Sequence, residues 1–110
     1  MPGKFLAEFE LYVMLAIAQL GANAYGAAVR QEIETRTGRP VSIGALYATL
    51  ARLEAKGLLT LRTSRASGQR GRARRYGRLT PAGDTALRHS ATMLGRMMHG
   101  LQLTAEPRTK

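Results

Sequence analysis

The chain has 110 residues and carries 17 Lys and Arg against 7 Asp and Glu, which gives a formal charge of +10. This length fits a single domain, and because no run of 18 residues is free of charged and polar side chains, we expect no membrane-spanning helix. The chain has no cysteine, which excludes disulfides, thiolate metal sites and cysteine nucleophiles and leaves the cytoplasm as the default location.

The positive charge is concentrated in one segment. Residues 1–61 have a net charge of +1, residues 62–78 contain seven arginines and no acidic residue, and residues 79–110 have a net charge of +2. Such a segment favours a polyanionic partner, which leaves nucleic acid, anionic lipid or an acidic protein as candidates.

Hydrophobic spacing predicts two helices in the first part of the chain. The first, Phe5–Leu20, has apolar residues on more than one face, so it should be buried on two sides, with a second subunit as the candidate for one of them. The second covers Tyr25–Thr37, with Val29 and Ile33 pointing inward, and Gly38 follows it as a helix end.

A third helix is expected over Ile43–Lys56, with Ser42 as its N-cap. Its predicted apolar face consists of Ile43, Leu46, Leu50 and Leu53. The opposite face is small and weakly polar, which permits close approach to a partner but also reflects good helix propensity; it comprises Gly44, Ala45, Ala48, Thr49 and Arg52.

Strands and a last helix are expected in the second half. Leu58–Thr63 and Arg74–Leu79 have strand character and flank a basic, turn-forming stretch, which predicts a hairpin with a cationic tip. Thr80 and Pro81 predict the start of a helix that runs to about Leu101. Its apolar seam has coiled-coil spacing: Leu87, Ala91, Leu94, Met98 and Leu101.

The order of these elements predicts a mostly α-helical fold with a small β-hairpin. Three helices followed by a two-stranded hairpin form a winged helix-turn-helix, in which the third helix enters the major groove and the hairpin is the wing. We therefore divide the chain into a winged helix-turn-helix DNA-binding domain at 1–80, a C-terminal helix for dimerisation at 81–103 and a flexible tail at 104–110.

The residues of these elements resemble the PadR family of bacterial transcriptional regulators. Residues 44–59, GALYATLARLEAKGLL, match the family pattern around the recognition helix, and residues 25–26 match its Tyr-Gly pair. Residues 72–76 and 79–83, RARRY and LTPAG, match its basic wing strand and the start of its last helix. Two residues depart from the pattern: Ala45 replaces a Thr or Ser, which removes a hydroxyl, and Ala48 replaces a Pro. The single short last helix is similar to the compact branch of the family.

Double-stranded DNA, and not a membrane, is the expected partner. Ser42 and Gly44 lie where helix N–H groups suit a phosphate, and Thr49 and Arg52 are expected to project outward, with Arg matched to guanine. Tyr47 either contacts the DNA, as the resemblance implies, or packs the helix against the domain. The full set predicted on the recognition helix is Ser42, Gly44, Ala45, Tyr47, Ala48, Thr49 and Arg52.

The arginines of the predicted wing are expected to neutralise phosphates and release counterions. Along a strand, Arg74 and Tyr76 share one face and Arg75 points to the other. The alternative is a solvated loop that only improves solubility. The predicted wing contacts are Arg70, Arg72, Arg74 and Arg75.

The two helices with surplus apolar surface predict a homodimer across a two-fold axis, as the resemblance also implies. The alternative is that the last helix folds back on its own domain. The predicted interface residues are Phe5, Phe9, Leu87, Ala91, Leu94, Met98 and Leu101. The resemblance further implies an apolar or aromatic effector near this interface, where Met93 and Met97 would line the pocket unless they belong to the core.

These patterns predict a sequence-specific regulator and, following the family, a repressor. No cofactor, metal site or catalytic residue is expected, because His89 and His99 are ten residues apart and the chain shows neither a phosphate-binding loop nor a Ser-His-acid set. A non-specific nucleic-acid or nucleoid-binding protein is the main alternative, since charge alone would suffice for it. An adaptor that uses the fold without DNA is the other.

Overall fold

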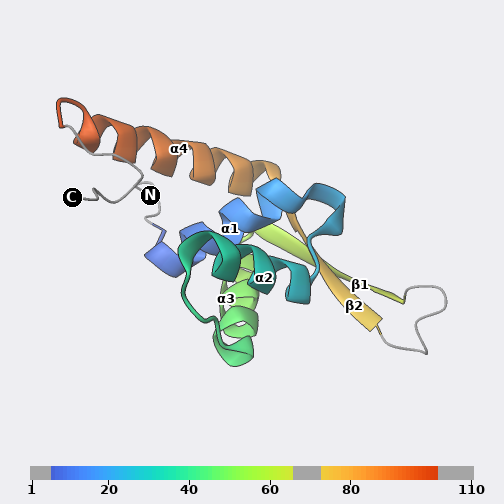
Figure 1. Cartoon of the computed structure of the whole chain (residues 1–110). Coiled ribbons are helices and arrows are strands. Elements are labelled where there is room, and N and C mark those ends of the chain that lie inside the picture. The colour runs from blue at the N-terminus through green and yellow to red at the C-terminus, as the bar shows by residue number, and fades with distance from the viewer. Residues whose placement is uncertain (1–5, 66–72, 102–110) are drawn as a thin grey trace.

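A computed structural model describes residues 6–65 and 73–101 of the chain. The predicted order of elements is confirmed, and the fold is a winged helix. Figure 1 shows a body of helices, a hairpin that projects from it, and a last helix that lies along one side. The elements are α1 (Glu8–Leu20), the 3-10 turn η1 (Gly21–Asn23), α2 (Gly26–Thr37), α3 (Ile43–Ala55), β1 (Leu59–Arg65), β2 (Ala73–Leu79) and α4 (Pro81–Met98).

The sequence at the helix ends explains these boundaries. The Ser42 hydroxyl accepts a hydrogen bond from the N–H of Ala45 at 3.0 Å, and the Thr80 hydroxyl accepts one from the N–H of Gly83 at 2.9 Å, so α3 and α4 both have side-chain N-caps. Helix α2 ends at Gly38, whose φ of 72° lies in the left-handed region that glycine adopts most easily.

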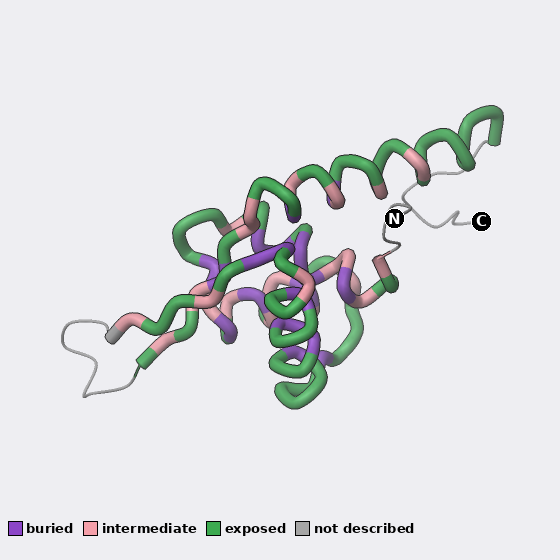
Figure 2. The backbone as a smooth tube through the Cα atoms, turned by 180° about the vertical axis from the view of Figure 1, so that it is seen from behind, coloured by how far each residue is buried: buried purple, intermediate pink, exposed green. Residues whose placement is uncertain are grey.

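Helix α1 is the centre of the hydrophobic core. It packs against α2, α3, α4 and β2, and its Val13 and Met14 are fully buried. Leu46, Leu50 and Leu53 of α3 are buried as predicted, but Ile43 is 44% exposed. The prediction for Ile43 is wrong because this residue begins α3, at the end that points away from α4 (Figures 1 and 2).

The hairpin is anchored to the helices at its base. Strands β1 and β2 are antiparallel, with Leu59 opposite Leu79 at the base and Arg65 opposite Ala73 at the far end. The N–H of Gly77 donates to the carbonyl of Ala24 at 2.8 Å, which ties β2 to the segment before α2.

Within the residues that the structure describes, the hydrogen bonds between helix α4 and the body lie at the start of the helix. The Thr80 hydroxyl donates to the carbonyl of Gly57 at 2.7 Å, and the Thr80 N–H donates to the carbonyl of Leu58 at 3.1 Å. Leu87 joins the core, so its predicted place in a dimer interface is wrong. The alternative that the last helix folds back on its own domain therefore holds for the first part of α4. Figure 2 shows the rest of the helix almost wholly exposed. No helix within the two described stretches is both long enough and apolar enough to cross a bilayer.

Candidate nucleic-acid interface

The predicted recognition helix exposes a small-residue surface at its N-terminal half. Ser42, Gly44, Ala45 and Ala48 are all exposed, and α3 and the hairpin both project from the side of the molecule opposite α4 (Figure 1). A surface without bulky side chains next to a basic hairpin allows close contact with a large polyanion.

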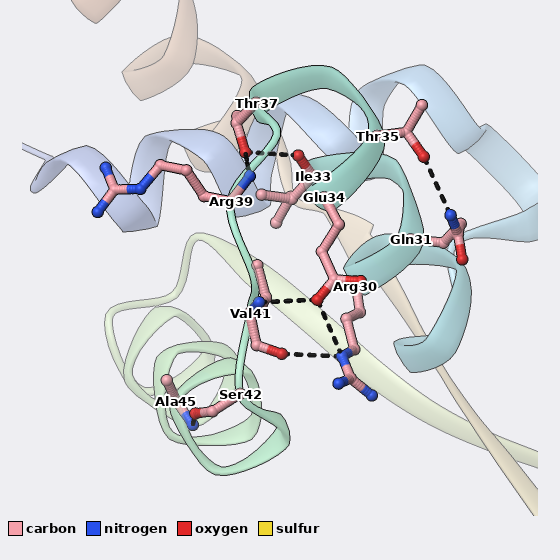
Figure 3. Close-up of polar contacts among 10 residues, drawn as sticks. All are labelled: Arg30, Gln31, Ile33, Glu34, Thr35, Thr37, Arg39, Val41, Ser42 and Ala45. Carbon is pink, nitrogen blue, oxygen red and sulfur yellow. Dashed lines mark hydrogen bonds and ion pairs between the residues drawn. The ribbon is translucent and has the colours of Figure 1, made fainter.

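A network of polar contacts places the start of α3 relative to α2 (Figure 3). The Arg30 Nε donates to the carbonyl of Val41, and the N–H of Val41 donates to Oε2 of Glu34, both at 2.8 Å. The Nε of Arg30 and Oε2 of Glu34 are 3.5 Å apart. Arg30 and Glu34 both belong to α2, and no local sequence signal marks them as contacts of the next loop. They fix the residue immediately before the Ser42 cap.

Tyr47 packs against the beginning of α2. A Cβ atom on Gly26 would lie 2.3 Å from the Tyr47 hydroxyl oxygen, so the end of the tyrosine side chain lies directly against this glycine. The Tyr47 side chain is nevertheless 36% exposed. The packing interpretation is therefore confirmed, and the ring edge is still available to a partner.

The prediction that Thr49 projects outward is wrong, because its side chain is buried and only 1% exposed. Its hydroxyl accepts a hydrogen bond from Nη2 of Arg52 at 3.0 Å. Since a buried hydroxyl needs a hydrogen-bond partner, this contact explains how a polar residue fits beside Leu50 in the core-facing surface. Arg52 itself is exposed along its side chain, but its guanidinium bonds to its own helix.

The C-terminal half of α3 is tied to α1 by a buried carboxylate. Glu10 is 4% exposed, its Oε2 accepts a hydrogen bond from Nζ of Lys56 at 2.9 Å, and the Nε of Arg52 is 3.7 Å away. Burial by itself raises the pKa of Glu10, but the hydrogen bonds from Lys56 and from the N–H of Ala7, with the charges of Lys56 and Arg52, lower it below its ordinary value. Sequence reasoning missed Glu10, because a glutamate in a first helical turn is usually a solvated residue.

At the hairpin, two arginines lie against aromatic rings. The guanidinium of Arg74 lies over the ring of Tyr25 at 4.1 Å, and that of Arg62 lies over the ring of Tyr76 at 5.3 Å. The rings of Tyr25 and Tyr76 meet edge to face, with centroids 5.7 Å apart. The contact of Arg74 holds β2 against Tyr25, the residue before α2, whereas the contact of Arg62 with Tyr76 lies within the hairpin.

Other basic residues of the hairpin are directed to solvent. Arg75 is exposed opposite Thr63, and Arg78 is exposed opposite Thr60. The predicted contacts Arg70 and Arg72 lie outside the described residues. Arg75 and Arg78 of β2 are therefore open to a polyanion.

A groove of about 530 Å³ separates α1 from α4. Met93 and Met97, the predicted effector residues, both line it, together with Leu6, Leu11, Tyr12 and Leu94. The predicted interface residues Ala91, Leu94, Met98 and Leu101 are exposed, whereas Phe9 is partly buried against the core. Phe5 lies outside the described residues.

Comparisons with known proteins agree in family and fold. The family model described as the transcriptional regulator PadR-like family matches residues 14–89. The transcriptional regulator Rv3488 of Mycobacterium tuberculosis is 53% identical over 68 residues, which are 59% of this chain and 57% of that protein. The chain thus matches less than two thirds of this relative's length.

Solved structures give the same result. A PadR family transcriptional regulator from Eggerthella lenta is 31% identical, with a TM-score of 0.64 over 84% of this chain and 83% of that one. F93 from STIV, a winged-helix DNA-binding protein, is 18% identical, with a TM-score of 0.65 over 88% and 98% of the two chains. The second likeness shows the fold alone.

Proposed function

The chain belongs to the PadR-like family of transcriptional regulators, which are not enzymes. We propose that it is a sequence-specific repressor that binds double-stranded DNA as a homodimer. The observation that carries the proposal is that α3, with its exposed first half, and a hairpin with outward arginines both project from the body away from α4 (Figure 1). The likeness to a winged-helix DNA-binding protein supports it, and the repressor assignment follows the PadR resemblance.

In this proposal the N-terminal half of α3 enters the major groove. Its small exposed surface permits close approach, and its Ser42 cap leaves the first N–H groups of the helix near the backbone phosphates. Tyr47 contacts the sugar-phosphate backbone with its exposed edge. The proposed base-proximal residues are Ser42, Gly44, Ala45 and Ala48.

The hairpin supplies the phosphate contacts that set the position of the protein on the duplex. Arg75 and Arg78 are exposed on β2. Arg74, which belongs to the same strand, is held against Tyr25. Arg70 and Arg72 belong to the same proposed surface by sequence. Because the charge is concentrated here, the affinity should fall steeply as the salt concentration rises.

The outer half of α4 forms the dimer interface in this proposal. Leu94 and Met98 are about half exposed, and Met97 is 78% exposed, on a helix that extends away from its own domain. A two-fold axis through this seam would bury these side chains and place two α3 helices on a pseudo-palindromic operator.

A small apolar or aromatic effector would bind in the groove between α1 and α4 and release the repressor. Met93 and Met97 line the groove, and methionine adapts its shape to different apolar ligands. The groove lies beside the proposed dimer seam, so an occupant would change how two copies meet.

Two parallel binding titrations test the proposal. A fluorescent duplex from the protein's own promoter is titrated at about 0.15 M salt, next to a scrambled duplex of the same base composition. We expect at least tenfold tighter binding to the promoter duplex, in line with the specificity ratios of known regulators. Equal affinities would instead support the non-specific nucleic-acid-binding alternative, and no binding to either duplex would support an adaptor.

A further inference from the structure

Glu10 is a buried acidic residue that the proposed DNA contacts do not use. It lies in the first turn of α1, and its side chain is only 5% exposed. It contacts Arg52 of α3, which is 42 positions away in the sequence. A buried carboxylate is retained only where its charge and its hydrogen bonds are matched by partners.

Both oxygens of Glu10 have such partners. Oε1 accepts a hydrogen bond from the N–H of Ala7 at 3.0 Å, and Oε2 faces Nζ of Lys56 at 2.9 Å and Nε of Arg52 at 3.7 Å. The two cations come from successive turns at the end of α3. The carboxylate therefore joins α1 to the C-terminal half of the proposed recognition helix.

The guanidinium of Arg52 is held from a second side as well. Its Nη2 donates to the buried hydroxyl of Thr49 at 3.0 Å, while its Nε faces Glu10. In the group that could bond to both O6 and N7 of a guanine, Nη2 thus donates to its own helix and Nε faces the carboxylate on α1. Moving it into a groove would leave the Thr49 hydroxyl without this donor and the Glu10 carboxylate with one cation fewer.

We propose that Glu10 is a positioning residue that determines base preference by keeping Arg52 from contacting bases. This inference rests on the proposed function, since it concerns what α3 presents to the DNA. With Arg52 withheld, the operator is recognised by the exposed first half of α3 and by the hairpin, and Arg52 makes no guanine contact. Loss of the Glu10 charge frees Arg52 to seek a guanine.

Selection of bound sequences from duplexes with a random core tests this inference. The wild-type protein is compared with Arg52→Ala, Glu10→Gln and the double variant Glu10→Gln/Arg52→Ala. We expect Arg52→Ala to enrich the same motif as the wild type. We expect Glu10→Gln to gain a guanine preference of about tenfold at one position in each half-site, and the double variant to lose it again.

Lys56→Gln is the matched control. It removes the other cation from Glu10 and leaves the contact between Glu10 and Arg52 in place, so its motif should equal that of the wild type. A change in base preference, unlike a loss of affinity, does not follow from weakened folding.

Two results would overturn the inference while the proposed function stands. One is a motif in which Arg52→Ala loses a guanine that the wild type selects, because Arg52 would then read that base directly. The other is a folded Glu10→Gln protein with an unchanged motif. If Glu10→Gln does not fold, Arg52→Ala still tests the premise, because the Arg52 side chain is largely exposed and the variant should fold. Failure of the wild-type protein to enrich any motif would instead remove the proposed function.

Discussion

Gly83 lies where α4 comes closest to the rest of the domain. A Cβ atom at this position would be 1.9 Å from the carbonyl oxygen of Leu58, and this oxygen also accepts the hydrogen bond from the N–H of Thr80. The neighbouring atom belongs to the backbone, so it cannot move aside as a side chain could. The residue therefore sets the distance between α4 and the turn that follows α3.

Replacing Gly83 with alanine should destabilise the protein. The added methyl group must displace either α4 or the Leu58 backbone, and overpacking of this kind costs about 1–3 kcal/mol. Urea denaturation would show it as a lower midpoint.

Gly95→Ala is the control for this substitution, because Gly95 lies in the same helix and nothing stands within 4 Å of its added Cβ. There the better helix propensity of alanine should raise stability by about 0.5–1 kcal/mol. Equal midpoints for the two variants would contradict the close contact at Gly83.

The buried carboxylate of Glu10, paired with the half-buried Lys56, should make stability depend on pH. The pKa of Glu10 is lowered in the folded protein from its ordinary value of 4.5. A carboxyl whose pKa is lower in the folded state stabilises that state above the ordinary pKa and loses this contribution as the pH falls through the folded value. The stabilisation is thus complete at neutral pH.

Glu10→Gln should lower the free energy of unfolding at pH 7 by about 1.5–3 kcal/mol, the usual range for a hydrogen bond to a charged group. The difference from the wild type should shrink as the pH falls below 4.5. Thermal melts between pH 3 and pH 7 measure this difference, with Glu54→Gln as the control, since Glu54 is an exposed acid of α3. A difference that stays constant with pH would contradict the role of the charge.

At the scale of elements, the two strands divide their arginines between two tasks. Arg62 and Arg74 lie on the aromatic rings that anchor the hairpin, whereas Arg75 is exposed on the opposite face of β2. The alternation expected of a strand places Arg75 on the face opposite to the residues that hold the wing.

Arg75→Ala should weaken DNA binding by a similar factor for all sequences. It should also lower the slope of log affinity against log salt by about one, as expected for the loss of one phosphate contact. Fluorescence titrations at several salt concentrations give this slope. Arg88→Ala removes the same charge from α4, where Arg88 pairs with Asp84, and its slope should equal that of the wild type.

Most element boundaries could be predicted from the sequence, because caps such as Ser42 and Thr80 and the periodic leucines of α3 are local signals. Side-chain directions on α3 were harder to predict. Thr49 was expected outside because it is polar, but a donor three residues later makes its burial possible. Arg52 depends on Glu10 of another helix, and no local pattern can reveal a contact across 42 positions.

At the scale of the whole molecule, the exposed apolar seam of α4, which includes Leu94 and Met98, is the proposed contact with a second copy of the chain. Leu94→Glu should place a charge in the proposed interface and shift the protein from a dimer of about 24 kDa, twice the 12.0 kDa of one chain, to a monomer. Light scattering at micromolar concentration would measure the mass. Thr92→Glu changes an exposed residue on the polar side of the same helix and should leave the dimer intact. A wild-type monomer would contradict the dimer.

Among the described residues, the hydrogen bonds that attach α4 to the body lie at its base, so the helix can act as a lever. Its 18 residues span about 27 Å at 1.5 Å per residue. A rotation of about 7° around the contact of Thr80 and Gly83 with the end of α3 would therefore move the far end by about 3.4 Å, the rise of one base pair. In the proposed dimer, a rotation of a few degrees at this contact in each copy would change the spacing of the two recognition helices relative to the major grooves of the duplex.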